Sequence, residues 1–481
     1  MKKRWRVYTL LCIELGVVKV KDQALAKRMI DWGYSTGCFG TSMVSQVVLT
    51  WIIFFYSPPD PEAAFAPAMY AGAALAAGRV VGALADPLVA VWSDNRRGGA
   101  WGRRLPFMAG GGLPTVLAFT LLWRPPVAGS ALINAIYLGL ILSLFFFFYT
   151  VYTGPYLAIL PELADTPERR LSLVEKQALF YIGGVAGAAV ISGLLIDTYG
   201  FGVMSLVIGA MALLSFYVPV FQLRHVKWQP GDERRSFGSA LQCIWQNRIF
   251  RLYVTAQVLF WFGLNMMVIA VPYVVTVLMF RDEGMVAMLM GLALCSALVG
   301  IGPITRAAKK RGTKAVYSFI MSWLGVNLLL IAFIGLGPVP AWLMGTIIVA
   351  LAGIPMAGMF TLPNSLMAEL AREGAATTGQ RQEAAYFGVQ GFMTKVSLVL
   401  SSTAASAILT AGGYQSGKDL GVRLLGLVAA LCVGLGVVAF RKFPLGAPAP
   451  SSQPPAPPVP PPAPPVPPPS SPTPPSLTRC G

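Results

Sequence analysis

Three ionisable residues stand inside long apolar stretches of the chain, where a charge is costly and commonly marks a functional pathway. Arg79 and Asp86 lie in one such stretch, and Lys395 lies in another, late in the chain. Arg79 and Asp86 are seven residues apart, about two helical turns, so a helix would carry both on one face. A carboxylate at this depth suits a cation or proton site, with Arg79 as its counter-charge or gate.

Lys395 needs an acid, water or a solute as its partner at that depth. We expect it to work with Asp86, because the two residues come from different halves of the chain. Structural interpretations stay open for both residues. Asp86 could anchor the loop after its helix, and Lys395 could form a structural ion pair or extend its ammonium toward the membrane surface.

The elements that position these charges are membrane-spanning helices. Of 481 residues, 55% are hydrophobic and 12% are charged, about half the charged fraction of a soluble domain. A bilayer crossing needs about 20 apolar residues, and we predict twelve such segments: 30–56, 65–93, 104–123, 131–160, 173–196, 202–223, 250–280, 285–305, 315–336, 339–369, 382–411 and 420–440. The predicted fold class is therefore an all-α integral membrane protein.

Positive charge predicts the orientation in the membrane. Alternate loops carry a series of basic residues: Arg96, Arg97, Arg103, Arg104, Arg169, Arg170, Arg224, Lys227, Arg234, Arg235, Arg306, Lys309, Lys310, Arg311 and Lys314. The opposite loops offer little beyond Arg124, Arg281 and Lys418. Both termini are predicted to be cytoplasmic in a multi-pass inner-membrane protein. Topology also explains the formal charge of +17, so no nucleic-acid partner is predicted.

Composition predicts five segments. Residues 1–28 are an N-terminal cytoplasmic extension, whose apolar run from Tyr8 to Val18 is too short to span; it could be an interfacial helix, or translation could begin at Met29. Residues 29–224 form the first six-helix half, 225–249 a cytoplasmic interdomain loop, and 250–443 the second half. Residues 444–481 are a proline-rich disordered tail, either without a specific partner or with a docking role.

The sequence contains little that would support an enzymatic function. The six cysteines show no paired spacing, and His225 is the only histidine, so a metal site is not predicted. We find no nucleophile–base set and no Walker loop, and therefore predict neither an enzyme nor a cofactor.

Corresponding features recur in the two halves. A loop rich in arginine and glycine, residues 94–104, separates the second and third predicted helices, and a similar loop, 302–312, separates the eighth and ninth. Helices four and ten end in related stretches, 155–163 and 363–370. Two six-helix pseudo-repeats of this kind resemble the major facilitator transporters.

The resemblance narrows to the glycoside-pentoside-hexuronide cation symporters. Its motifs are Ala85-Asp-Pro-Leu88, Trp92-Ser-Asp94, Trp101-Gly-Arg-Arg-Leu-Pro-Phe107, Tyr152-Thr-Gly-Pro-Tyr-Leu-Ala-Ile-Leu-Pro-Glu162 and Thr378-Gly-Gln-Arg-Gln-Glu-Ala-Ala-Tyr-Phe-Gly388. The resemblance covers about residues 30 to 440. It implies that Asp86 corresponds to the cation-site carboxylate, that Lys395 lies near both ligand sites, and that a sugar or glycoside is carried with H⁺ or Na⁺.

Several positions depart from the family pattern. Gly82, Thr153 and Ser42 stand where acids are expected, Leu157 replaces a tryptophan, and Lys176 or Gln177 is nearest to a missing arginine. These losses weaken the case for a sodium cage, which takes several oxygen ligands. Proton coupling through Asp86, or no coupling, remains open.

Two further groups complete the predicted site. Candidate solute contacts are hydroxyl, amide and aromatic residues, although for any single one of them helix packing is the better explanation: Tyr34, Gln46, Tyr149, Tyr152, Thr153, Tyr156, Asn265, Tyr386 and Gln390. Candidate cytoplasmic-gate residues lie near helix ends, where inter-half ion pairs or ordinary charge topology would explain them: Asp94, Arg103, Arg104, Glu162, Glu369, Arg381 and Glu383.

Secondary transport of a small-molecule solute is therefore the expected function, in a lipid bilayer and with a coupling cation as a second partner. A monomer would suffice for this architecture. Two rival interpretations stay open. One is an amphipathic solute such as a lysolipid, and the other is an assembly or sensor protein built on a transporter scaffold.

Overall fold

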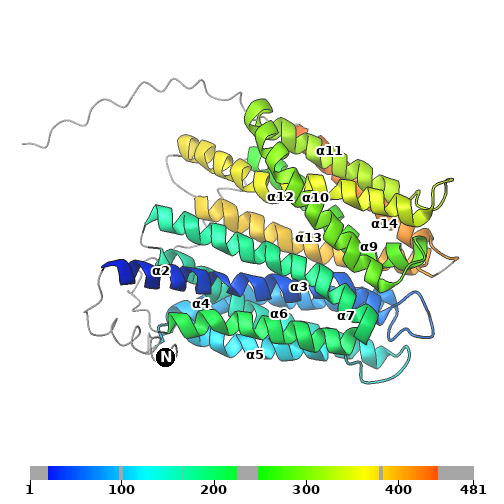
Figure 1. Ribbon diagram of the computed structural model, residues 1–481, viewed down its shortest axis with the longest axis horizontal. Helices are drawn as coiled ribbons and strands as arrows, with labels where there is room; N and C mark the ends of the chain where they lie inside the picture. Colours follow the sequence, from blue (N-terminus) through cyan, green and yellow to red (C-terminus); the bar gives the residue numbers. More distant parts are fainter. Residues whose placement is uncertain are drawn as a thin grey trace, which may run out of the picture. The chain divides into compact units, whose positions relative to one another are not determined.

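The structure is a computed structural model that describes residues 20–96, 101–164, 166–224, 248–378, 383–415 and 417–441. Within these ranges the chain forms a bundle of long helices (Figure 1). The helices of the first half are α2 (Val20–Ser35), α3 (Gly37–Tyr56), α4 (Ala68–Asn95), α5 (Leu105–Leu121), α6 (Leu132–Leu163) and α7 (Pro167–Leu223). Those of the second half are α9 (Arg248–Tyr273) with its π-helical end η1 (Val274–Leu278), α10 (Glu283–Arg311), α11 (Thr313–Ile331), α12 (Ala341–Thr378), α13 (Glu383–Gly412) and α14 (Leu420–Arg441).

Gly200 divides the longest helix into two membrane crossings. The apolar stretch Ser172–Leu223 has 52 residues, more than twice the length that a crossing needs. At Gly200 the backbone takes φ 76° and ψ 175°, a conformation open to glycine but strained for other residues. The two arms of α7 are therefore 167–199 and 201–223, and the break falls between the predicted fifth and sixth spans.

The described residues supply the predicted number of spans. Ten helical stretches are long and apolar enough to cross a bilayer. Counting the two arms of α7 separately and adding the shorter helix α5 (Leu105–Leu121) gives twelve. Large apolar side chains such as Leu84, Leu214 and Val299 point away from the protein interior, as lipid-facing residues do. The predicted all-α membrane fold is confirmed.

The helix that leads into the first span begins earlier than the sequence pattern predicts. Helix α2 starts at Val20, so its first turns lie within the predicted N-terminal extension. Hydropathy marks where apolar residues begin, whereas a helix also accepts the polar residues Lys21, Lys27 and Arg28 before it enters the membrane. The predictions for residues 1–19, for most of the interdomain loop (225–247) and for the tail beyond 441 lie outside the described residues.

Each half packs mainly on itself, and three helix pairs join the halves. In the first half α3 packs on α7 and α4 on α6; in the second, α10 packs on α12 and α9 on α14. The inter-half pairs are α4 with α13, α7 with α10, and α3 with α9. Buried serines on α13, including Ser402 and Ser406, keep its surface small and permit close approach to α4.

Candidate functional site

An ion pair between α4 and α13 joins the two halves of the protein. The Nζ of Lys395 donates to Oδ2 of Asp86, across 309 residues of sequence. The Asp86 side chain is 37% exposed and that of Lys395 46%. The structure therefore brings together the two residues that the sequence analysis paired. Because the pair is not sealed, a proton or solute approaching it could compete for either partner.

Arg79 contacts α13 on the same face of α4. Its guanidinium donates to the backbone carbonyl of Leu398, one turn beyond Lys395. Hydroxyls of Ser401 and Ser402 also donate to this carbonyl. Among the described residues the partner of Arg79 is thus a carbonyl rather than a carboxylate, and Asp86 is the one acid in this contact between α4 and α13.

Tyr149 of α6 is a predicted solute contact whose side chain is described. Its hydroxyl donates to the Thr41 carbonyl at 3.4 Å. Thr153, one turn along α6, donates to the Tyr149 carbonyl at 2.9 Å. Gln390 is partly exposed on α13, ahead of Lys395. The side chain of Tyr386 lies outside the described residues.

Tyr152 and Tyr156 serve helix packing in this conformation. Both side chains are fully buried. The Tyr152 hydroxyl donates to the Phe216 carbonyl at 3.1 Å, and the Tyr156 hydroxyl donates to the Tyr34 carbonyl at 2.9 Å. Tyr34 returns a bond to the Tyr156 carbonyl at 2.7 Å. These bonds hold α6 against α2 and α7, so neither tyrosine presents a surface to a solute.

Glu162 pairs within the first half rather than across the halves. It accepts from Arg103 and lies 2.8 Å from Arg104, whose guanidinium also donates to the Ala158 carbonyl. This pairing of Glu162 with Arg103 and Arg104 lies within the first half, because the start of α5 lies beside the end of α6. The side chains of the other candidate gate residues fall outside the described residues: Asp94, Glu369, Arg381 and Glu383.

A buried acid that the sequence analysis did not single out lies at the same end of the bundle. Asp31 of α2 is 5% exposed. Its Oδ1 accepts from Nη2 of Arg169 at 2.8 Å and from Nε at 3.2 Å, and its Oδ2 lies 3.7 Å from Nζ of Lys176. The signal was an acid at the start of the first span together with cations after the fourth. From sequence alone, Arg169 is interpreted as a marker of orientation and Lys176 as a residue near the position of a missing family arginine, and neither is paired with Asp31.

Replacing Asp31 should destabilise the first half. Asp31→Asn leaves Arg169 and Lys176 without their carboxylate, and breaking a buried pair in this way costs about 3 kcal/mol. The melting temperature of the detergent-purified protein should fall. Asp60→Asn, at an exposed loop acid, is the control and should leave it unchanged. Equal melting temperatures for the two variants would show that the Asp31 cluster does not stabilise the fold.

Apart from the bonds of Asp86 and Arg79, the inter-half hydrogen bonds of the described residues lie at the end of the bundle opposite to Asp31, beside loop 57–67. Tyr273 of α9 donates to the Ser57 carbonyl at 2.7 Å, and its ring packs edge-to-face on Phe54 with centroids 5.2 Å apart. The amide of Gly284 on α10 donates to Asp197 of α7 at 3.3 Å. Within the described residues, the halves are therefore held together at this end and in the middle of the bundle.

Twelve spans in two halves, joined by a charged pair between the halves, define a membrane transporter of the major facilitator type. A crystal structure of the nucleoside transporter NupG has this fold: it superposes with a TM-score of 0.64 at 14% identity, covering 87% of this chain and 98% of that chain. At this identity the likeness concerns the fold alone.

Sequence comparison places the chain more narrowly. The family model described as MFS/sugar transport protein matches residues 33–439, and the chain belongs to this family. An uncharacterized symporter of Synechocystis sp. is 34% identical over 156 residues, which are 31% of this chain and 28% of that protein. The isoprimeverose transporter of Lactiplantibacillus pentosus is 21% identical over 448 residues, covering 86% and 87% of the two chains. The predicted resemblance to sugar symporters is confirmed.

Proposed function

We propose that this protein carries a sugar or glycoside together with a proton, by alternating access. The observation that supports this most is the pair of Lys395 and Asp86, because it joins the two halves and remains partly exposed. Protonating Asp86 would remove the attraction that holds α4 to α13. A proton could thereby change the free-energy difference between conformations, which is what coupling requires.

Local charge favours a proton over sodium as the coupling ion. Among the described side chains, the contact between α4 and α13 contains two cations, Arg79 and Lys395, and a single carboxylate. Sodium would have to enter a cluster that is already net positive and that offers one acid. The family's second acid is replaced by Gly82, which faces Phe146 of α6. A proton needs only one basic oxygen, and Asp86 provides it.

The solute class is inferred from relatives and from polar side chains on α6 and α13. One relative that aligns over most of its length is an isoprimeverose transporter, and isoprimeverose is a disaccharide. Tyr149 carries a hydroxyl on α6 and Gln390 a partly exposed amide on α13, and such groups bond sugar hydroxyls. Neither the described residues nor the relatives specifically favour an amphipathic solute.

Alternating access is supported by the distribution of inter-half contacts. By the predicted orientation, the end held by Tyr273 and Ser57 faces outward. The described conformation would then be closed to the outside. Outward opening requires these contacts to separate while the halves rock about the central helices.

Transport by the purified protein in proteoliposomes tests this function. Labelled isoprimeverose and a panel of pentosides and hexosides are offered with an imposed pH gradient or, separately, with an imposed sodium gradient. We expect accumulation of at least one sugar with the pH gradient and none with sodium alone. Accumulation driven by sodium would refute the proton assignment, and failure of folded protein to move any sugar would refute the substrate class.

A further inference from the structure

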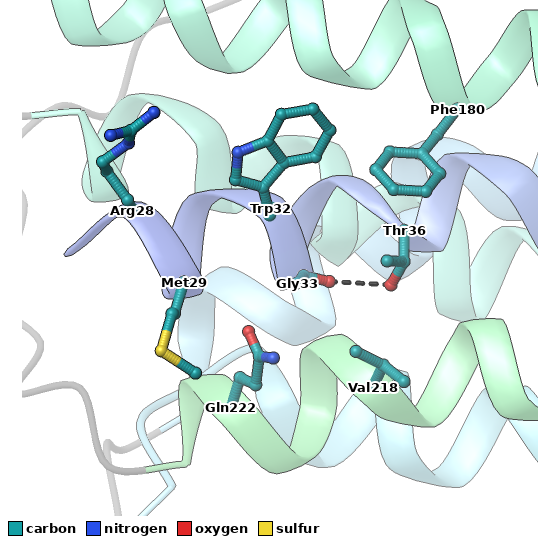
Figure 2. A pocket seen from close by; sticks show the side chains of 8 residues that line it. All are labelled: Arg28, Met29, Trp32, Gly33, Thr36, Phe180, Val218 and Gln222. Carbon is teal, nitrogen blue, oxygen red and sulfur yellow. Dashed lines mark hydrogen bonds between the residues drawn. The ribbon is translucent and has the colours of Figure 1, made fainter. Parts of the chain in front are cut away.

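A groove of about 460 Å³ lies on the first half (Figure 2), and neither Asp86 nor Lys395 lines it. It runs along α2 between the two arms of α7. Arg28 and Met29 stand at one end of the groove, and Trp32 and Phe180 line it further along (Figure 2). Val218, from the second arm, forms part of the opposite wall. The groove is thus cationic at its mouth and mainly apolar beyond it, with Thr36 and Gln222 as its polar lining residues.

The position of the groove places it at a membrane interface. Its residues lie at the beginning of the span Lys27–Tyr56 and near the end of the stretch Ser172–Leu223. Met29 is 58% exposed and Trp32 is 45% exposed. Tryptophan is typical of the boundary between headgroups and acyl chains. Such large apolar surface beside a span is covered by hydrocarbon in a bilayer.

Positive charge surrounds the mouth of the groove. Arg28 is exposed, and the described residues provide it with no carboxylate partner. Arg224 ends the second arm of α7, with its guanidinium 5.7 Å from the Phe221 ring centroid. Lys176 lies 5.9 Å from the ring of Trp32. The neighbouring acid Asp31 is already engaged by Arg169 and Lys176, so it does not neutralise Arg28.

We infer that this groove binds an anionic phospholipid of the leaflet on the basic side of the membrane. The phosphate lies at Arg28, and one acyl chain lies along Trp32, Phe180 and Val218. Basic pockets between transmembrane helices bind anionic headgroups in this way. A soluble anion would leave the exposed Met29 and Trp32 uncovered, whereas a lipid satisfies both the charge and the apolar surface.

Quenching of Trp32 by brominated lipid tests the inference on the full chain in detergent micelles. The protein is titrated with phosphatidylglycerol or phosphatidylcholine carrying the same dibrominated acyl chains. The difference between the wild type and Trp32→Phe isolates Trp32 from the other tryptophans. We expect phosphatidylglycerol to quench Trp32 at about fivefold lower concentration, the effect of one surface cation on an anionic headgroup.

Two charge variants identify the cation responsible. Arg28→Gln should remove the preference for phosphatidylglycerol and leave quenching by phosphatidylcholine unchanged. Arg170→Gln, at an exposed cation of the same end but outside the groove, is the matched control and should retain the preference. Equal quenching by both lipids, no quenching of Trp32, or equal effects of the two variants would each overturn the inference.

Discussion

Neutralising Asp86 is expected to destabilise the protein more than neutralising Lys395. Asp86→Asn leaves Arg79 and Lys395 together without a carboxylate, whereas Lys395→Gln leaves one cation and one acid. Uncompensated like charges in the membrane interior are unfavourable. Because the pair is partly exposed, we expect a difference of about 1–2 kcal/mol rather than the full cost of a buried pair. Thermal unfolding of the purified variants measures it.

The double variant separates charge from side-chain loss. Asp86→Asn combined with Lys395→Gln returns the cluster to the wild-type net charge and should recover most of the stability lost by Asp86→Asn alone. Asp60→Asn in the exposed loop is the control for loss of a carboxylate. If Lys395→Gln proves less stable than Asp86→Asn, the net charge of Arg79, Asp86 and Lys395 does not determine the stability of this contact.

Transport should respond more strongly than stability to these substitutions. Under the proposed function, Asp86→Asn loses gradient-driven accumulation by roughly a hundredfold, near the upper range of coupling free energies between sites. Exchange of labelled for unlabelled sugar at equilibrium needs no net proton movement and should persist. Accumulation and exchange measured in the same proteoliposomes distinguish loss of coupling from loss of folding. Full accumulation by Asp86→Asn would remove Asp86 from the coupling step.

The sequence was sufficient to predict the membrane spans and the central ion pair between Asp86 and Lys395, and each of these predictions has a physical basis. A span is a local property of about 20 residues, and a change of direction near Gly200 is visible as a short interruption between two apolar runs. Asp86 and Lys395 could be paired because few charges lie deep in the membrane, which leaves little choice of partner. Scarcity of deep charge makes such long-range contacts predictable.

Residues with many equivalent partners could not be assigned from sequence. Arg79 bonds to the carbonyl of Leu398, and every residue offers a carbonyl. Tyr152 and Tyr156 carry hydroxyls that suit a sugar equally well, but they bond to the backbone of neighbouring helices. Glu162 could have met cations of either half. In each case the helix arrangement decides the partner, and local sequence does not contain that arrangement.

Enlarging Gly72 is expected to open the end of the bundle that is closed in this structure. Gly72 lies near the start of α4, against Ser406 and the carbonyl of Ser402 on α13. A Cβ at Gly72 would stand 3.2 Å from that carbonyl and would overlap the Ser406 side chain. The carbonyl is fixed within a helix, so Gly72→Leu can be accommodated only if α4 and α13 separate at this end.

Separation at Gly72 should expose residues that are now buried between the halves. Ser402 is fully buried, so a Ser402→Cys probe should react slowly with a membrane-impermeant maleimide in the otherwise unchanged protein. Adding Gly72→Leu should raise the labelling rate roughly a hundredfold, as expected when a minor conformation of about 1% becomes the major one. The same protein lacking Ser402→Cys gives the background from native cysteines.

A matched glycine tests whether helix separation, rather than added bulk, produces the effect. Gly434 of α14 has open space around its Cβ position, so Gly434→Leu should leave both labelling and transport unchanged. Gly72→Leu should in contrast hold the protein open at one end and abolish net transport, because alternating access needs both conformations. Unreactive Ser402→Cys together with normal transport in Gly72→Leu would mean that α4 and α13 do not form the closure at this end. The contact between Tyr273 and Ser57 would then be the principal barrier.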